Sequence, residues 1–149
     1  MRRVRLSDPL VAPLLAGLAD EYEARYGASD EMALAHAGEF DPPSGVFLAL
    51  VDGASLVAGG GLRYLSPGVC EVKRMWTRAD RRREGHAATV LAALEDAARL
   101  AGYSTLRLET GPAQPEAAAL YASRHYRRIP AYGRYTAALA FELALVGES

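Results

Sequence analysis

The sequence predicts one α+β domain with a mixed, mostly antiparallel sheet of six to seven strands. Apolar runs at residues 46–51, 56–65 and 69–77 follow one another, separated by turn residues, as in an antiparallel meander. A long helical pattern and another apolar run come next, which is the order of a parallel crossover. The 149 residues are 50% hydrophobic, so we expect a single domain over residues 1–149 with one sizeable core.

The N-terminal third is expected to form a short strand and two helices. Residues 3–6 are the strand, and Ser7-Asp8-Pro9 starts a helix, with a capping side chain before a proline. Pro13 kinks that helix or delays its start, and residues 30–37 predict a second, shorter helix. The basic and then apolar start also imitates a signal peptide, but polar residues and a proline interrupt it. The apolar face of the first helix contains Leu10, Leu14, Leu18 and Tyr22.

The three central strands are joined by recognisable turns. The first strand ends at Asp52-Gly53, a hairpin signal, and Ser66-Pro67-Gly68 turns the chain into the third strand. Gly59-Gly60-Gly61 lies inside the second strand, where glycine is costly unless a bulge or a close backbone approach requires it. We therefore expect a local irregularity at these glycines.

A basic loop and a long helix follow the third strand. The loop runs from Arg81 to Ala88, and the helix opens at Gly85 and ends at Gly102. Free N–H groups at a helix N-terminus, together with arginine side chains, make an anion site suited to phosphate. Two known phosphate loops are excluded, because one needs a lysine here and the other needs two more glycines. The apolar residues of the helix recur at Val90, Leu91, Leu94, Ala97, Ala98 and Ala101.

The C-terminal part is expected to complete the sheet. Residues 105–109 should pair in parallel with the strand before the long helix. A last helix covers residues 116–124, and residues 126–129 and 135–145 are closing strands. The final strand places one face at Tyr135, Ala137, Leu139, Phe141 and Leu143.

Composition argues against several classes of partner and site. The formal net charge of −1 argues against a general nucleic-acid binder. Cys70 is the only cysteine and the three histidines are scattered, which argues against a disulfide and a metal site. No apolar run approaches the ~20 residues of a membrane span, so no membrane partner is expected. A group of acidic residues is either a solvated face or a collar that attracts a cationic amine: Asp20, Glu21, Glu23, Asp30, Glu31, Glu39 and Asp41.

Two patterns, in order, resemble the Gcn5-related N-acetyltransferase (GNAT) family. Arg82-x-x-Gly85-x-Ala87 resembles its pyrophosphate loop, and Gln114-x-x-Ala117-x-x-Leu120-Tyr121 resembles its Asn-x-x-Ala-x-x-Leu-Tyr helix. The resemblance covers residues 45–129. It implies a three-layer α/β/α fold with the central strands splayed at a bulge. It also implies an acetyl-CoA-dependent, cytoplasmic N-acetyltransferase of a primary amine or a peptide amino terminus, and it allows a homodimer.

The resemblance also assigns catalytic roles. Tyr121 inherits the role of general acid toward the coenzyme A thiolate, although packing within its helix face is the alternative. Glu71 is the first candidate for the general base and Glu109 is the second. The alternative for Glu71 is a cross-strand ion pair with an arginine.

Coenzyme A is expected to lie along the loop and the bulged strand. Backbone N–H groups of residues 83–88 would bind the pyrophosphate, Met75 and Thr77 would pair with pantetheine, and Arg78 or Arg81 would reach the 3′-phosphate. The full set of predicted coenzyme-binding residues is Met75, Trp76, Thr77, Arg82, Arg83, Glu84, Gly85, His86, Ala87, Ala88, Gln114 and Tyr121.

Two residues depart from the family pattern. Gln114 is one methylene longer than the usual asparagine, and His125 stands where a glycine is usual. We interpret His125 as a helix cap with positive φ. These departures leave open an acyl-CoA-binding sensor without turnover. A phosphate-binding domain unrelated to coenzyme A is a third interpretation.

Overall fold

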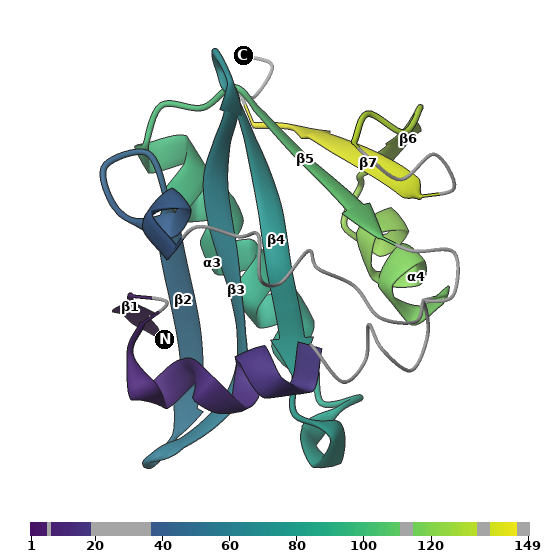
Figure 1. Cartoon of the computed structure of the whole chain (residues 1–149). Coiled ribbons are helices and arrows are strands. Elements are labelled where there is room, and N and C mark those ends of the chain that lie inside the picture. The colour runs from purple at the N-terminus through teal and green to yellow at the C-terminus, as the bar shows by residue number, and fades with distance from the viewer. Residues whose placement is uncertain (6, 19–36, 111–114, 134–137, 146–149) are drawn as a thin grey trace.

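The computed structural model describes residues 1–5, 7–18, 37–110, 115–133 and 138–145. Within them lies one seven-stranded sheet in the order β1-β2-β3-β4-β5-β7-β6 (Figure 1). Only β4 and β5 pair in parallel; every other neighbouring pair is antiparallel. The predicted mixed, mostly antiparallel sheet is confirmed. The strands are β1 Arg2–Val4, β2 Val46–Asp52, β3 Ser55–Ser66, β4 Val69–Thr77, β5 Thr105–Thr110, β6 Arg127–Ile129 and β7 Leu139–Ala144.

Helices cover both faces of the sheet. Helix α3 (His86–Leu100) lies on one face, while a helix over residues 12–18 crosses β2, β3 and β4 on the other face (Figure 1). Helix α4 (Pro115–Ser123) shares the face of α3, because Leu120 and Tyr121 pack with α3 in one buried cluster. A second cluster joins helix 12–18 to Phe40, Phe47 and Trp76. The described residues also contain three short 3₁₀ helices, which are η1 Pro9–Val11, η2 Ala37–Phe40 and η3 Ala79–Arg81.

A bulge distorts β4 opposite the three glycines of β3. Gly59 pairs with Trp76 and Gly61 with Lys73, so β4 has one more residue than β3 between these pairs. Arg74, within the bulge, has a φ of 61°. A side chain on Gly61 would collide with the Phe40 ring, so close packing explains the glycine. The expected irregularity at these glycines is confirmed as a bulge, and the packing of the Phe40 ring on Gly61 is a second reason for a glycine there.

Several predicted boundaries differ from the structure. The first helix begins at residue 12, after η1, because Asp8 caps the 3₁₀ turn instead through Leu10 N–H. The predicted helix at 30–37 lies outside the described residues up to position 36. Strand β6 starts at Arg127 rather than Tyr126, whose ring is buried in the core. Strand β7 starts at Leu139, and the predicted positions 135–137 lie outside the described residues.

Helix α4 ends in a Schellman cap, which sets the start of β6. Tyr126 N–H donates to the Tyr121 carbonyl, and His125 N–H donates to the Ala122 carbonyl. His125 has a φ of 71°, so the predicted positive-φ cap is confirmed. The predicted last residue of the helix, Arg124, is already in the turn.

Candidate active site

The sheet forks between β4 and β5. The parallel ladder has three residue pairs, from Val69 with Thr105 to Glu71 with Arg107, and the strands then diverge (Figure 1). Past the fork, β4 stays paired with β3 and β5 stays paired with β7. The predicted splay of the central strands is therefore confirmed, and Glu71 stands at its apex.

The edge of β4 that faces the fork carries the backbone groups of Met75 and Thr77. Arg78 N–H donates to the Val57 carbonyl of β3 at 2.8 Å. Because backbone groups of successive strand residues point to alternate sides, those of Met75 and Thr77 point away from β3. The Thr77 carbonyl accepts from Arg82 Nε at 3.2 Å. These are the two residues expected to pair with pantetheine.

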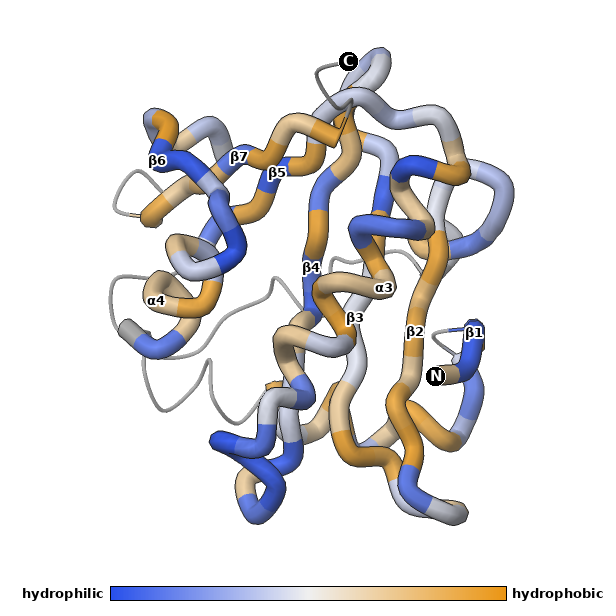
Figure 2. The backbone as a smooth tube through the Cα atoms, turned by 180° about the vertical axis from the view of Figure 1, so that it is seen from behind, coloured by the Kyte–Doolittle hydropathy of each residue, from blue (hydrophilic) through white to orange (hydrophobic). Residues whose placement is uncertain are grey.

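The loop before α3 presents backbone N–H groups. None of the N–H groups of residues 83–88 donates to a backbone carbonyl of the described residues. Arg83 and Gly85 have φ values of 65° and 84°, which turn successive N–H groups in the way that favours an anion. Figure 2 shows this connection between β4 and α3 as a hydrophilic stretch. The predicted coenzyme loop thus has free donors at a helix N-terminus.

Side chains around the loop form hydrogen bonds and ion pairs with one another. Arg81 donates to Glu84 at 2.9 Å and to Asp52 at 3.1 Å, and His86 Nε2 lies 2.9 Å from Glu84 Oε1. The hydrogen bond from Arg81, and then that from His86, hold the pKa of Glu84 below its usual value. Arg78 donates to Asp80 at 2.6 Å. Glu84 therefore orients Arg81 and His86, which is a supporting role.

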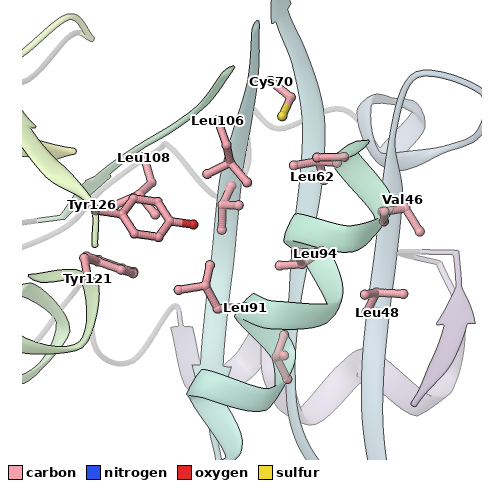
Figure 3. Packing of buried hydrophobic residues seen from close by; sticks show 14 of the residues in the cluster. Val46, Leu48, Leu62, Cys70, Leu91, Leu94, Leu106, Leu108, Tyr121 and Tyr126 are labelled. Carbon is pink, nitrogen blue, oxygen red and sulfur yellow. The ribbon is translucent and has the colours of Figure 1, made fainter. Parts of the chain in front are cut away.

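Tyr121 lies in the core on the α3 face of the fork. Its ring is 5.4 Å from Phe141 and 5.8 Å from Tyr126, measured between centroids. Figure 3 shows Tyr121 beside Tyr126 in the core. Burial raises its pKa to about 12, and no described residue accepts a hydrogen bond from its hydroxyl. The packing that we gave as the alternative is present, and the hydroxyl stays protonated at neutral pH.

The buried carboxylate of Glu95, on α3, binds Tyr126, whose ring packs against Tyr121. Glu95, 4% exposed, accepts from Tyr126 Oη at 2.9 Å and from Arg124 Nη2 at 2.7 Å. Together with the Schellman cap, these bonds fix the end of α4 against α3. Glu95 was not among the predicted site residues, because in sequence it reads as an ordinary polar position of an amphipathic helix.

Glu71 lies on the opposite face of the sheet from Tyr121. Its neighbours Cys70 and Val72 face α3, so the alternation of the strand turns Glu71 to the other side. Arg63, its cross-strand partner, donates to Oε1 at 2.9 Å from Nε, and Nη2 lies 2.8 Å from the same oxygen. Arg63 also donates to Glu39 at 2.8 Å. The ion pair named as the alternative for Glu71 is therefore present.

The second oxygen of Glu71 is occupied by a residue that the sequence did not single out for catalysis. Tyr132 Oη donates to Oε2 at 2.6 Å. Burial, and then the Glu71 carboxylate, raise the pKa of Tyr132 above its usual value. No sequence pattern connects Tyr132 with Glu71, because the two residues are 61 positions apart.

Glu109 binds the same segment through its backbone. Its Oε2 accepts from the N–H groups of Tyr132 and Gly133, both at 3.2 Å. Leu106 and Leu108 face the α3 side, so Glu109 lies on the same face as Glu71. The structure therefore brings both candidate bases to one segment, residues 132–133.

The other predicted residues are distributed around this arrangement. Trp76 packs in the core against helix 12–18, so its side chain lies on the face away from α3. Ala87 and Ala88 are in the first turn of α3, whereas Gln114 lies outside the described residues. In the described part of the chain, no cluster of His, Cys, Asp and Glu could hold a metal ion. No helix in that part is long and apolar enough to cross a membrane.

Comparisons with known proteins agree with this architecture. The sequence matches the model of the Acetyltransferase (GNAT) family over residues 12–126. A Klebsiella pneumoniae protein assigned as an acyl-CoA N-acyltransferase has a TM-score of 0.79 and 26% identity, covering 97% of this chain and 96% of that one. A GNAT-family acetyltransferase from Staphylococcus aureus has a TM-score of 0.79 and 13% identity, covering 97% and 99%. No curated protein matches the sequence.

One similar structure contains the coenzyme. It is an aminoglycoside 6′-N-acetyltransferase complexed with coenzyme A, with a TM-score of 0.69 and 15% identity. It covers 100% of this chain and 99% of the other. At this identity, the likeness shows the fold alone.

Proposed function

Because the chain belongs to the Acetyltransferase (GNAT) family, we propose that it transfers the acetyl group of acetyl-CoA to a primary amine. The amine, on a small molecule or a peptide amino terminus, attacks the thioester directly within a ternary complex. The observation that carries the proposal is the fork between β4 and β5, which has the coenzyme loop at one end and candidate proton-transfer groups on both faces.

The loop and the open edge of β4 suit an acyl-CoA. The N–H groups of residues 83–88 would bind the pyrophosphate, with Gly85 and Ala87 leaving room for it. Met75 and Thr77 would pair with the amide groups of pantetheine, as a partner strand would. A backbone N–H of this edge would also stabilise the negative charge that develops on the thioester oxygen.

The two faces of the sheet separate the two proton transfers. Tyr121 would donate to the leaving thiolate from the α3 face, and Glu71 would accept the amine proton from the other face. A tyrosine with a pKa near 12 is a weak acid toward a thiol of pKa ~8.5, so Tyr121 contributes mainly as a hydrogen-bond donor. Its loss is therefore expected to cost roughly ten- to a hundredfold in kcat.

Release of free coenzyme A, followed with a thiol reagent, tests the proposal. Acetyl-CoA is incubated with pools of aminoglycosides, polyamines, amino acids and short peptides, using the wild type, Tyr121→Phe and Tyr64→Phe. Tyr64 is 51% exposed and serves as the matched control. We expect turnover that needs one pool, falls in Tyr121→Phe and persists in Tyr64→Phe. Saturable acetyl-CoA binding without turnover on any pool would support the acyl-CoA-binding sensor instead.

A further inference from the structure

We propose that Tyr132 is a catalytic residue, which takes a proton from the acceptor ammonium and passes its own hydroxyl proton to Glu71. The proposal rests on the function proposed above and identifies the group that touches the amine. Its starting point is the environment of Glu71, which leaves the residue only 3% exposed.

Glu71 is inaccessible as a base on its own. The residue is 3% exposed, Oε1 accepts from Arg63 and Oε2 accepts from the Tyr132 hydroxyl. Oε2 keeps a second acceptor site, but the burial of the residue shields it from an amine that arrives from solvent. Tyr132 is half-buried, so it is the outer member of the pair.

The arrangement fixes Tyr132 from three sides. Glu109 accepts its backbone N–H, the guanidinium carbon of Arg107 lies 5.7 Å from the centroid of its ring, and Glu71 accepts its hydroxyl. Glu71 and Arg107 form the last pair of the β4–β5 ladder, so the hydroxyl lies at the apex of the fork. A thioester that passes through the fork would meet an amine at this point. The Tyr132 hydroxyl is therefore held in place before substrate binds.

The hydrogen bond supports transfer through the tyrosine rather than ionisation of it. At 2.6 Å, the Tyr132–Glu71 contact has the length of a hydrogen bond from a hydroxyl to a carboxylate. Tyr132 resists losing its proton to solvent, because it is buried beside a carboxylate. Its oxygen can accept a proton as its own proton moves to Oε2, so no tyrosinate forms.

The protons balance over one turnover. The ammonium gives one proton to the Tyr132 oxygen, and the Tyr132 proton moves to Glu71, leaving a neutral amine and a carboxylic acid. The nitrogen lone pair forms the N–C bond, and the C–S bond breaks with its electron pair on sulfur. After the attack, the nitrogen loses a second proton and the departing thiolate takes up one proton. The net release is therefore the single proton held on Glu71. Glu71 returns its proton through Tyr132 to solvent after the amide leaves.

Steady-state kinetics of Tyr132→Phe and Glu71→Gln, together with their double variant, test the relay. We expect kcat to fall about a hundredfold in each single variant, the lower part of the range for general acid–base catalysis. The double variant should lose little more, since the two groups act as one unit. The KM for acetyl-CoA should stay within about threefold, because neither side chain lies on the coenzyme loop.

Tyr103→Phe is the matched control. Tyr103 donates its hydroxyl to the Ser44 carbonyl at 2.7 Å, away from the fork, and its loss should leave kcat unchanged. Thermal melts and acetyl-CoA binding confirm that the Tyr132 and Glu71 variants are folded, and Glu71→Gln tests the relay with the Tyr132 hydroxyl in place. If Tyr132→Phe turns over as fast as the wild type or faster, Tyr132 is a gate over Glu71 and the relay is wrong. A wild type without turnover on any amine overturns the proposed function as well.

Discussion

Glu95→Ala is expected to destabilise the fold by about 2–4 kcal/mol. The substitution leaves the Tyr126 hydroxyl without an acceptor in a residue that is 6% exposed, which costs roughly 1–3 kcal/mol. Arg124, with a side chain that is 31% exposed, can turn to water, so the loss of its bonds adds only about 1 kcal/mol. For a chain of this size, the melting temperature should fall by about 3 °C per kcal/mol.

A double-mutant cycle separates the two contributions. Tyr126→Phe alone removes one donor from a Glu95 that keeps Arg124, so we expect a cost of about 1–2 kcal/mol. In the Glu95→Ala background, the same change removes an unsatisfied hydroxyl and should be neutral or stabilising. Equilibrium urea unfolding, followed by circular dichroism, gives the coupling free energy, expected at about 1–2 kcal/mol. Strictly additive single effects would falsify this account of the cluster.

Three further predictions concern acetyl-CoA binding by the loop, the packing of the core and the dependence of stability on alkaline pH. Gly85→Ala should weaken acetyl-CoA binding about five- to tenfold, because φ is 84° and a Cβ there has open space, so only ~1 kcal/mol of backbone strain arises. The control is Gly102→Ala, at the other end of α3, where φ is 90°. It should lower the free energy of unfolding in urea as much as Gly85→Ala does, but leave the Kd for acetyl-CoA unchanged. If both variants change this Kd equally, the assignment of the loop to the coenzyme is wrong. Gly61→Ala should lower the free energy of unfolding by about 1–3 kcal/mol, whereas Gly38→Ala, which meets no atom, should cost much less; equal costs would exclude the collision. Burial raises the pKa of Tyr121 from 10.0 to about 12, so its contribution to stability is complete below pH 10 and is lost as the pH rises toward 12. In Tyr121→Phe, the free energy of unfolding should decrease by about 2–3 kcal/mol less than in the wild type as the pH rises through this range. If the two proteins show the same slope of stability against pH between 10 and 12, the hydroxyl is not buried.

Local signals account for the parts of the fold that the sequence predicted well. Strand β4 has the predicted bounds, 69–77, because turn residues precede it and a basic loop follows it. Gly85 begins α3 as its N-cap with positive φ, and His125 adopts the predicted cap conformation. Each of these features depends on neighbours within a few residues, which a sequence pattern contains.

Contacts between distant segments could not be predicted in the same way. Glu71 and Tyr132 are separated by 61 positions, and nothing in either segment marks the other as its partner. Glu71 was a candidate base and a candidate partner of an arginine, but neither interpretation included a tyrosine on its second oxygen. The polar bonds of Glu95 were missed for the same reason, because they require the packing of α4 on α3.

The boundary errors have a physical cause in capping. A side chain or a glycine decides where a helix stops by satisfying a few N–H or carbonyl groups, and competing caps lie within one or two residues of each other. The sequence predicts Asp8 as the cap of a long helix, whereas Asp8 caps the short η1 turn in the structure. The sequence predicts Arg124 as the last residue of the helix, whereas α4 ends at Ser123 and the Schellman bonds follow.

The parallel ladder between β4 and β5 is short. With three residue pairs, it is the only hydrogen-bonded link in the described sheet between strands β1 to β4 and strands β5 to β7, while the buried cluster beneath α3 packs against both groups. Beyond Glu71 and Arg107 the two strands no longer pair with each other. An acyl-CoA lying in the fork would contact both strands and link their facing edges. Ligand binding should therefore slow amide hydrogen exchange in β4 and β5 together.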